Sequence, residues 1–339
     1  MRAVRLHAPG QQLRTEEVTT PKPTGTQVSI RVAGCGVCHT DLHIVDGTQT
    51  RVTFPVTLGH EVAGWVESVG PDAGGVPALD SPVLVHGGWG CGDCRDCRAG
   101  AEQRCARSVA PGFQADGGYA DAMLVPHPRH LVPLTTLDPV RAAPLADAGV
   151  TPYRAVHRAE RWLTPGARVL LIGCGALGQF ALQYLRLVPD AGPGLRIAVR
   201  EQSPLRMERA KELGADSTLL DGDGASSIEA LGGPADVVLD FVGTDATLAS
   251  AAGTVAPDGL VVVIGEAGGS LHFGFDTVPV EAWLTTVAWG AHDDLRQVVR
   301  LAESGALRWD IDPVPLGEAN AAHARLRAGA VTGRLVLVP

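Results

Sequence analysis

Arg168-Val169-Leu170-Leu171-Ile172 leads directly into Gly173-Cys174-Gly175-Ala176-Leu177-Gly178 near the middle of this 339-residue chain. The first five residues form an apolar run typical of a buried strand, and the glycines after it have the G-x-G-x-x-G spacing and open a helical stretch. Here the first glycine allows a tight turn, the second lets backbone approach a pyrophosphate, and the third lets helix and strand pack closely, while the helix N-terminus adds partial positive charge. The stretch predicts a dinucleotide site at Gly173, Gly175, Ala176, Leu177 and Gly178; the alternative is an ordinary strand-to-helix turn.

From about residue 150 onward, apolar strand runs alternate with helical stretches. Further strands are predicted at 196–199, 235–240 and 260–265, with a helix at 203–213 between the first two. This alternation is typical of a parallel sheet with helices on its faces. We therefore predict an α/β fold containing a doubly wound parallel sheet.

The first half of the chain has a different texture, with many glycines and prolines and short alternating runs such as 28–32 and 62–69. These features predict a compact β-rich domain. After about Trp289 come a predicted helix at 293–304 and a last strand at 334–338, which we expect to fold back onto the first domain. The predicted domains are residues 1–149 together with 290–339, and residues 150–289.

The charge and composition exclude several classes of partner. The hydrophobic fraction of 45% is ordinary for a globular protein. The formal net charge is −9, so the composition gives no sign of a basic surface that would bind nucleic acid or an anionic membrane. No run reaches the roughly 18 apolar residues of a membrane span, and the first residues alternate like a strand instead of forming a signal peptide. We expect a cytoplasmic protein with no nucleic-acid or membrane partner.

Four of the seven cysteines lie in one short segment with the spacing C-x2-C-x2-C-x7-C. In a reducing compartment, clustered cysteines bind metal more often than they pair, and four thiolates make a closed tetrahedral zinc site. The segment therefore predicts a structural zinc, with a pair of disulfides as the alternative. Its ligands would be Cys91, Cys94, Cys97 and Cys105.

A second metal site is predicted upstream, where Cys38 precedes His60. A catalytic zinc has three protein ligands and one open position, and Asp147 is the best candidate for the third. On the residues alone, a capping or solvated role for Asp147 is equally open. Asp41 could accept a hydrogen bond from the second ring nitrogen of His60. Glu61 is either an occasional fourth ligand or a carboxylate that supports the ligands, and we favour the second role.

The residues after the second predicted strand bear on the choice of cofactor. A carboxylate there suits the adenosine ribose of NAD, whereas a basic residue suits the 2′-phosphate of NADP. Arg200 and Ser203 favour the phosphate and Glu201 opposes it. The sequence thus slightly favours NADP; the alternative is that Arg200 faces solvent and Glu201 binds the ribose.

Taken together, these motifs resemble those of zinc-dependent medium-chain alcohol dehydrogenases, and the resemblance covers essentially the whole chain. The segments that carry it are Cys38-His39-Thr40-Asp41, Gly59-His60-Glu61, the four-cysteine segment, the turn at Gly173 and Gly149-Val150-Thr151. It implies a GroES-like β-barrel catalytic domain interrupted by a Rossmann domain, with the active site in the cleft. Asp147 stands where bacterial secondary-alcohol dehydrogenases of this family place an aspartate ligand.

The resemblance also implies a cofactor set, a proton relay and a reaction. Two zinc ions per chain and NADP or NAD would support reversible hydride transfer between a secondary or bulky aryl or alkyl alcohol and its ketone or aldehyde. Thr40 would bond the substrate oxygen and His43 would pass the proton to solvent. The remaining cofactor contacts would come from His39, Thr151, Val242, Gly265 and Arg334.

Substrate, assembly and rival functions are less constrained by the sequence. Trp89, Trp289 and Phe54 are candidates for an aromatic pocket wall. Alternatives within the superfamily are a polyol, sugar or threonine dehydrogenase, or a zinc-free reductase, and a more distant one is a catalytically silent binding protein. The resemblance implies a homotetramer, with a dimer as the alternative, and residues 271–289 are the expected subunit contact.

Overall fold

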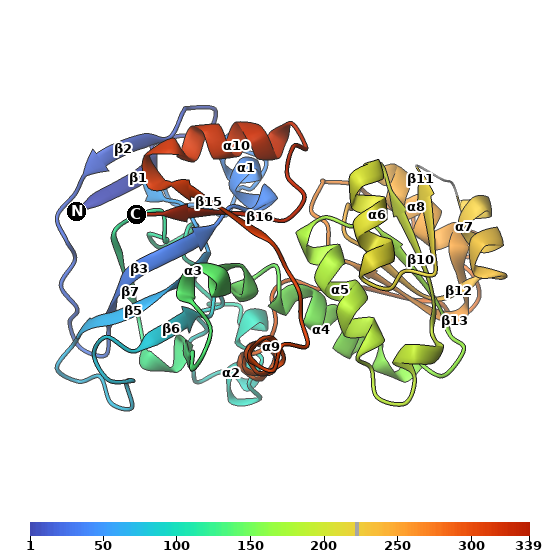
Figure 1. Ribbon diagram of the computed structural model, residues 1–339, viewed down its shortest axis with the longest axis horizontal. Helices are drawn as coiled ribbons and strands as arrows, with labels where there is room; N and C mark the ends of the chain where they lie inside the picture. The colour runs from blue at the N-terminus through green and yellow to red at the C-terminus, as the bar shows by residue number, and fades with distance from the viewer. Residues whose placement is uncertain (221–223) are drawn as a thin grey trace. The chain divides into compact units, whose positions relative to one another are not determined.

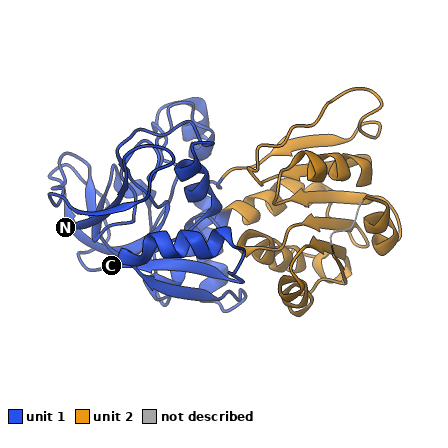
Figure 2. Ribbon diagram, turned by 90° about the horizontal axis from the view of Figure 1, so that it is seen from above, with its two compact units in different colours: residues 1–150, 289–339 blue, residues 151–288 orange. Residues whose placement is uncertain are grey.

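The computed structural model describes residues 1–220 and 224–339, and the chain divides into two compact units (Figure 2). Unit 1 consists of residues 1–150 and 289–339, and unit 2 of residues 151–288. Unit 2 is thus a continuous insertion in the chain of unit 1.

Unit 2 is built on a six-stranded parallel sheet (Figure 1). Its strand order is β11-β10-β9-β12-β13-β14, so the chain order reverses between β9 and β12, as in a Rossmann sheet. The strands are β9 (Arg168–Ile172), β10 (Arg196–Glu201), β11 (Ser217–Leu220), β12 (Ala235–Asp240), β13 (Val255–Val263) and β14 (Trp283–Thr286). The helices are α4 (Val150–Ala159), α5 (Ala176–Arg186), α6 (Pro204–Glu212), α7 (Gly224–Leu231) and α8 (Asp245–Thr254).

The central strand β9 explains why the sequence forms this sheet. Val169, Leu170 and Leu171 are fully buried, as expected where helices cover both faces of a parallel sheet. The turn after β9 requires glycine at two places. Gly173 has a φ of 86°, and a Cβ on Gly178 would lie 2.4 Å from the Gly173 carbonyl oxygen.

Unit 1 contains a seven-stranded sheet and a three-stranded sheet. The larger has the order β15-β16-β3-β5-β6-β8 with β7 paired to β3, and the smaller has the order β2-β1-β4. The strands are β1 (Arg2–Leu6), β2 (Arg14–Glu17), β3 (Val28–Gly36), β4 (Val56–Thr57), β5 (Glu61–Val69), β6 (Pro82–Val85), β7 (Ala122–Val125), β8 (Leu131–Pro133), β15 (Ile311–Pro315) and β16 (Arg334–Val338). The helices are α1 (His39–Asp46), α2 (Arg95–Arg98), α3 (Pro139–Ala142), α9 (His292–Glu303) and α10 (Ala319–Arg327).

The C-terminal segment completes the larger sheet of unit 1. Strand β16 pairs antiparallel with β3, with Val336 opposite Gly36 and Leu337 opposite Cys35, and helix α10 packs against α1 (Figure 1). The fold class predicted from the sequence is confirmed. Among the described residues, no helix is both long and apolar enough to cross a membrane.

Three buried histidines connect the start of α9 to the rest of unit 1. His86 Nε2 donates to the carbonyl oxygen of Gly290 at 2.8 Å, and His292 Nε2 lies 3.4 Å from His130 Nδ1. The rings of His86 and His292 stack at 4.1 Å with 25° between their planes. A ring nitrogen binds a metal in the plane of its ring, and the planes of two stacked rings are nearly parallel and do not meet at one point between them. We therefore interpret the cluster as part of a hydrogen-bonded core and not as a metal site. Burial, reinforced by neighbouring histidines, lowers the pKa of both His130 and His292 to about 2.

This cluster predicts an acid-sensitive fold. Because these folded-state pKa values lie below the ordinary value of about 6.5, the unfolded chain binds protons first as the pH falls. The contribution is complete above about pH 6.5 and is lost below it, by up to about 1.4 kcal/mol per pH unit for each histidine. We expect His292→Gln to make the decline in unfolding free energy below about pH 6.5 shallower by up to about 1.4 kcal/mol per pH unit. Urea unfolding between pH 7 and pH 5 measures this slope.

The control replaces an exposed histidine on α4, in His157→Gln, and should leave the decline unchanged. Equal slopes for wild type and His292→Gln would show that the cluster does not carry the acid sensitivity.

Candidate active site

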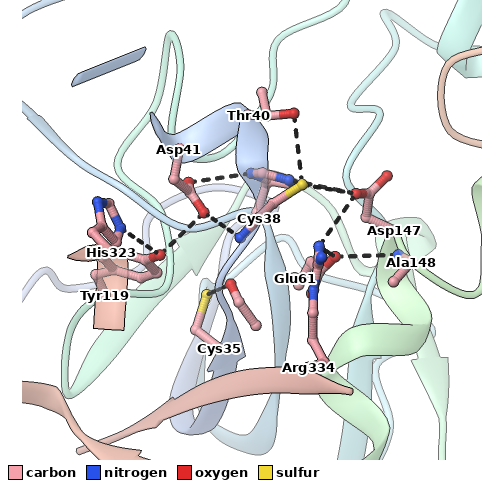
Figure 3. Close-up of polar contacts among 12 residues, drawn as sticks. Cys35, Cys38, Thr40, Asp41, Glu61, Tyr119, Asp147, Ala148, His323 and Arg334 are labelled. Carbon is pink, nitrogen blue, oxygen red and sulfur yellow. Dashed lines mark hydrogen bonds and ion pairs between the residues drawn. The ribbon is translucent and has the colours of Figure 1, made fainter. Parts of the chain in front are cut away.

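Three metal-binding side chains meet in unit 1 from distant parts of the chain. Cys38 lies between β3 and α1, His60 directly precedes β5, and Asp147 follows a short 3-10 helix at Ala143–Ala146. Asp147 Oδ2 is 3.6 Å from Cys38 Sγ and 3.6 Å from His60 Nε2 (Figure 3). All three side chains are buried.

These donor atoms fit a zinc ion. With zinc–sulfur bonds of about 2.3 Å and zinc–nitrogen or zinc–oxygen bonds of about 2.0 Å, the edges of a tetrahedral site are about 3.3–3.5 Å long. The two observed separations are close to these values. A thiolate, an imidazole and a carboxylate leave a fourth position open, which is the pattern of a catalytic zinc site.

Asp41 lies on the opposite side of the His60 ring from Asp147. Its Oδ2 accepts a hydrogen bond from the backbone N–H of Cys38 at 2.8 Å, and its Oδ1 is 3.6 Å from His60 Nδ1. A carboxylate at Nδ1 favours the tautomer in which Nε2 is free to bind metal. The separation of 3.6 Å is longer than a hydrogen bond, so the hydrogen bond that the sequence predicted between Asp41 and His60 remains a prediction.

Glu61 is held by a buried arginine. Arg334 Nε donates to its Oε2 at 2.9 Å, Arg334 Nη2 donates to its Oε1, and the N–H of Ala148 also donates to Oε1 at 3.2 Å (Figure 3). Burial raises the pKa of Glu61, and the Arg334 guanidinium counteracts part of that rise. These contacts favour the supporting role for Glu61. The contact predicted between Arg334 and a cofactor phosphate remains a prediction, since the guanidinium here pairs with Glu61.

The predicted relay residues belong to helix α1. Thr40 Oγ1 is 3.6 Å from Cys38 Sγ, so its hydroxyl lies beside the metal donors. His43 is half-buried on the same helix, and His39, the first residue of α1, is exposed. The relay of a proton from Thr40, through the nicotinamide ribose hydroxyl of the cofactor, to His43 remains a prediction.

Two aromatic rings flank His60. Phe113 lies 5.7 Å and Trp289 6.3 Å from the His60 ring, and the two are 6.0 Å from each other. A Cβ on Gly87 would lie 3.0 Å from the Trp289 ring, so glycine there makes room for the tryptophan. The sequence analysis missed Phe113, because a lone phenylalanine carries no spacing signal. Phe113 and Trp89 are both buried in the core of unit 1, and Trp289 is partly buried against that core.

Phe54, the third aromatic candidate, is partly buried against the same core. The sequence analysis also missed Tyr119, whose hydroxyl donates to Asp41, and His323, whose Nε2 contacts the same hydroxyl. Neither residue belongs to a recognisable motif.

In unit 2, the loops after three neighbouring strands converge on the glycine-rich turn. A Cβ on Gly173 would lie 2.9 Å from Val242 Cγ2, and a Cβ on Gly265 would lie 2.2 Å from the Val242 backbone. The structure thus brings Gly173, Val242 and Gly265 together at the carboxyl ends of β9, β12 and β13, where α/β sheets bind dinucleotides. Gly175, Ala176, Leu177 and Gly178 form the turn and the first residues of α5. Thr151 is buried in the first turn of α4.

The side chains of the two charged residues at the end of β10 contact different parts of unit 2. Arg200 is buried and donates from Nη1 to Ser250 Oγ at 2.6 Å. The carboxylate of Glu201 accepts from the N–H of Cys174 in the glycine-rich turn at 2.8 Å, and from the N–H of Ser203 at 3.0 Å. The Glu201 side chain therefore contacts the turn, whereas Arg200 contacts it through its backbone carbonyl, which accepts from the N–H of Gly173 at 2.8 Å.

The four-cysteine segment also fits a zinc ion. Its sulfur atoms all lie within 4.8 Å of one another, with Cys91 Sγ 3.8 Å from Cys97 Sγ and 3.6 Å from Cys105 Sγ. Four sulfurs at about 2.3 Å from a central zinc are separated by about 3.8 Å, whereas a disulfide needs about 2.05 Å. The geometry supports the zinc hypothesis over the disulfide alternative.

Comparison with known proteins identifies the family. Residues 24–136 match the alcohol dehydrogenase GroES-like domain, and residues 213–337 match the zinc-binding dehydrogenase domain. The chain is 36% identical to the D-arabinose 1-dehydrogenase (NADP(+)) of Saccharolobus solfataricus, over 97% of this chain and 95% of that protein. It is also 36% identical to an NAD-dependent alcohol dehydrogenase of Sulfurisphaera tokodaii, over the full length of both.

Among solved structures, the alcohol dehydrogenase of Aeropyrum pernix superposes with a TM-score of 0.91 at 34% identity, and the match covers all of both chains. The chain therefore belongs to the zinc-dependent medium-chain alcohol dehydrogenases, a family of oxidoreductases.

The four-cysteine segment generates a prediction about stability. We expect Cys97→Ser to lower the zinc content by one ion per chain, because the serine hydroxyl does not replace a thiolate at a closed zinc site. Loss of about 3 kcal/mol of unfolding free energy would lower Tm by roughly 6–12 °C. Metal analysis and thermal unfolding measure both effects.

Cys174→Ala serves as the control, since Cys174 belongs to neither metal cluster. Unchanged zinc content in Cys97→Ser would contradict the assignment.

Proposed function

We propose that the chain catalyses reversible hydride transfer between an alcohol bearing apolar substituents, secondary or bulky aryl and alkyl alcohols above all, and NAD, with a ketone or aldehyde as the product. The observation that carries this proposal is the buried set of Cys38, His60 and Asp147, whose donor separations suit a zinc ion with an open position.

The residues of unit 1 divide the work at this site. Cys38, His60 and Asp147 would hold the zinc, which when bound supplies Lewis-acid polarisation of the substrate oxygen. Asp41 keeps the His60 ring in the tautomer that exposes Nε2. Thr40 Oγ1 would accept the proton of the substrate hydroxyl while donating its own to the nicotinamide ribose hydroxyl of a bound cofactor, and the His43 imidazole would take up the proton from there and release it to water. A second, structural zinc would be held by the four-cysteine segment, and the need for reduced thiols suits a cytoplasmic location.

For the cofactor we propose NAD, although the sequence slightly favoured NADP. Arg200 bonds to Ser250, and the Glu201 carboxylate occupies the position at the end of β10 that binds the adenosine ribose in Rossmann domains. A negative charge there repels a 2′-phosphate. Named relatives include both NAD-dependent and NADP-dependent enzymes, so the local charge is the stronger argument.

The aromatic residues beside the metal donors support an apolar substrate. The partly buried Trp289 and the buried Phe113 place aromatic rings next to His60, and such apolar surroundings favour aryl or alkyl groups over polyhydroxylated ones. The similarity to a D-arabinose 1-dehydrogenase keeps a sugar or polyol as the second candidate. Initial rates on a panel of secondary alcohols, ketones and sugars distinguish the two.

We also propose self-association, as a homotetramer with a dimer as the alternative. The apolar side chains of Phe273, Phe275, Val280 and Trp283 are 50–92% exposed in unit 2. Exposed apolar patches of this kind mark protein contacts. Light scattering should give a multimeric mass that Phe275→Asp lowers, and a monomeric wild type would end the proposal.

The metal assignment predicts opposite results for two substitutions of one residue. Asp147→Ala should lose one zinc ion and lower kcat/KM by at least about a thousandfold, or about 4 kcal/mol, because polarisation of the substrate oxygen is lost. Asp147→Cys supplies a thiolate and should keep two zinc ions per chain. Asp121→Ala, which removes an ion pair with Arg2, is the control. Full activity in Asp147→Ala would refute the assignment.

The cofactor assignment predicts a change in preference. Glu201→Gln keeps the shape of the side chain and one acceptor oxygen but removes the negative charge, so the ratio of kcat/KM for NAD to that for NADP should fall about tenfold, or 1.4 kcal/mol. Arg200→Ala tests the alternative. If the wild type prefers NADP and Arg200→Ala abolishes that preference, the proposal of NAD is wrong.

A further inference from the structure

Asp41 depends on neighbours to keep its position. Its side chain is fully buried, and its two carboxylate oxygens contact different groups. Oδ2 accepts from the N–H of Cys38 at 2.8 Å and from the hydroxyl of Tyr119 at 3.0 Å, while Oδ1 faces His60 Nδ1 at 3.6 Å. Because a carboxylate is planar, two donors on Oδ2 determine where Oδ1 points.

Tyr119 is connected to His60 by a second route. A Cβ on Gly59, the residue before His60, would lie 2.4 Å from Cδ1 of the Tyr119 ring, so the ring packs directly on this backbone. The N–H of Tyr119 also donates to the carbonyl oxygen of Leu58 at 2.9 Å. The ring thus holds the chain that carries His60, and the hydroxyl holds the carboxylate that faces its ring.

His323 extends this chain of contacts to helix α10 (Figure 3). Its Nε2 lies 3.2 Å from the Tyr119 hydroxyl oxygen. The Tyr119 proton is directed to Asp41, since the carboxylate can only accept, so His323 Nε2 must donate to the phenol oxygen. Burial, with the charge of Asp41, raises the pKa of Tyr119, which keeps this phenol a donor.

We propose that Tyr119 and His323 are positioning residues for the metal ligand His60, acting through Asp41. The chain His323–Tyr119–Asp41–His60 aims Nε2 at the metal position and restrains the ring when the metal leaves or its coordination changes. This inference rests on the proposed catalytic zinc. It concerns how firmly the zinc is held and not whether the site exists.

The test measures zinc release from the intact enzyme. Tyr119→Phe removes only the hydroxyl and keeps the ring against Gly59. Its catalytic zinc should pass to a chelator at least about tenfold faster than in wild type, as expected when a residue supporting a ligand is lost. The visible absorption of the enzyme with cobalt at the catalytic site should also change.

The zinc held by the four cysteines is the internal reference and should be released at the wild-type rate. Tyr184→Phe, which removes a buried hydroxyl from unit 2, should match wild type in both measurements.

Two substitutions at His323 test the outer end of the chain. His323→Leu removes the donor and should speed release, whereas His323→Gln restores an N–H donor and should recover the wild-type rate. If His323 only supported the fold, faster zinc release would be accompanied by a lower Tm. Faster release in His323→Leu with an unchanged Tm, and a wild-type rate in His323→Gln, therefore indicates a positioning role.

The outcomes separate the two proposals. Wild type without a second zinc would refute the proposed function. Wild type with two zinc ions and turnover, but with equal release rates in Tyr119→Phe and both His323 variants, would refute only the positioning role.

Discussion

Three carboxylates share a small buried region of unit 1, and the need to compensate their charge is the constraint on which the site depends. Asp41 and Glu61 are fully buried and Asp147 is 9% exposed. An unpaired buried carboxylate costs several kcal/mol, so each needs a partner within the protein or a bound cation. Backbone N–H and hydroxyl donors serve Asp41, and Arg334 serves Glu61. Asp147 faces His60 Nε2 at 3.6 Å and Arg334 Nη2 at 3.9 Å, and together with the thiol of Cys38 it forms a pair for which a divalent cation provides a natural counter-charge.

Much of the architecture could be predicted because its signals are local. The turn that begins at Gly173 is recognisable from eleven consecutive residues, and the four-cysteine segment from fifteen. In both, the spacing alone forces the residues into proximity whatever the rest of the chain does. Cys38 and His60 are also near in sequence. Asp147 was identified largely by family resemblance, because its contact with Cys38 spans 109 residues.

The remainder of the site depends on long-range packing that no spacing encodes. Tyr119 reaches Asp41 across 78 residues and His323 across 204 residues. Phe113 and Trp289 meet only because both pack near His60. The choice between NAD and NADP remains a prediction for a different reason. Which of two adjacent residues at the end of β10 faces the turn depends on the pleat, and a shift of one position reverses the answer.

The pairing of β16 with β3 has a consequence for the living cell. A ribosome makes the chain from its N-terminus, so Arg334, the charged partner of Glu61, is made only after the whole of unit 2. Until Arg334 is in place, the nascent polypeptide carries an acidic group with nowhere to be buried. Premature termination before Arg334 would leave that defect permanent. Burial of Glu61 is thereby tied to synthesis of β16.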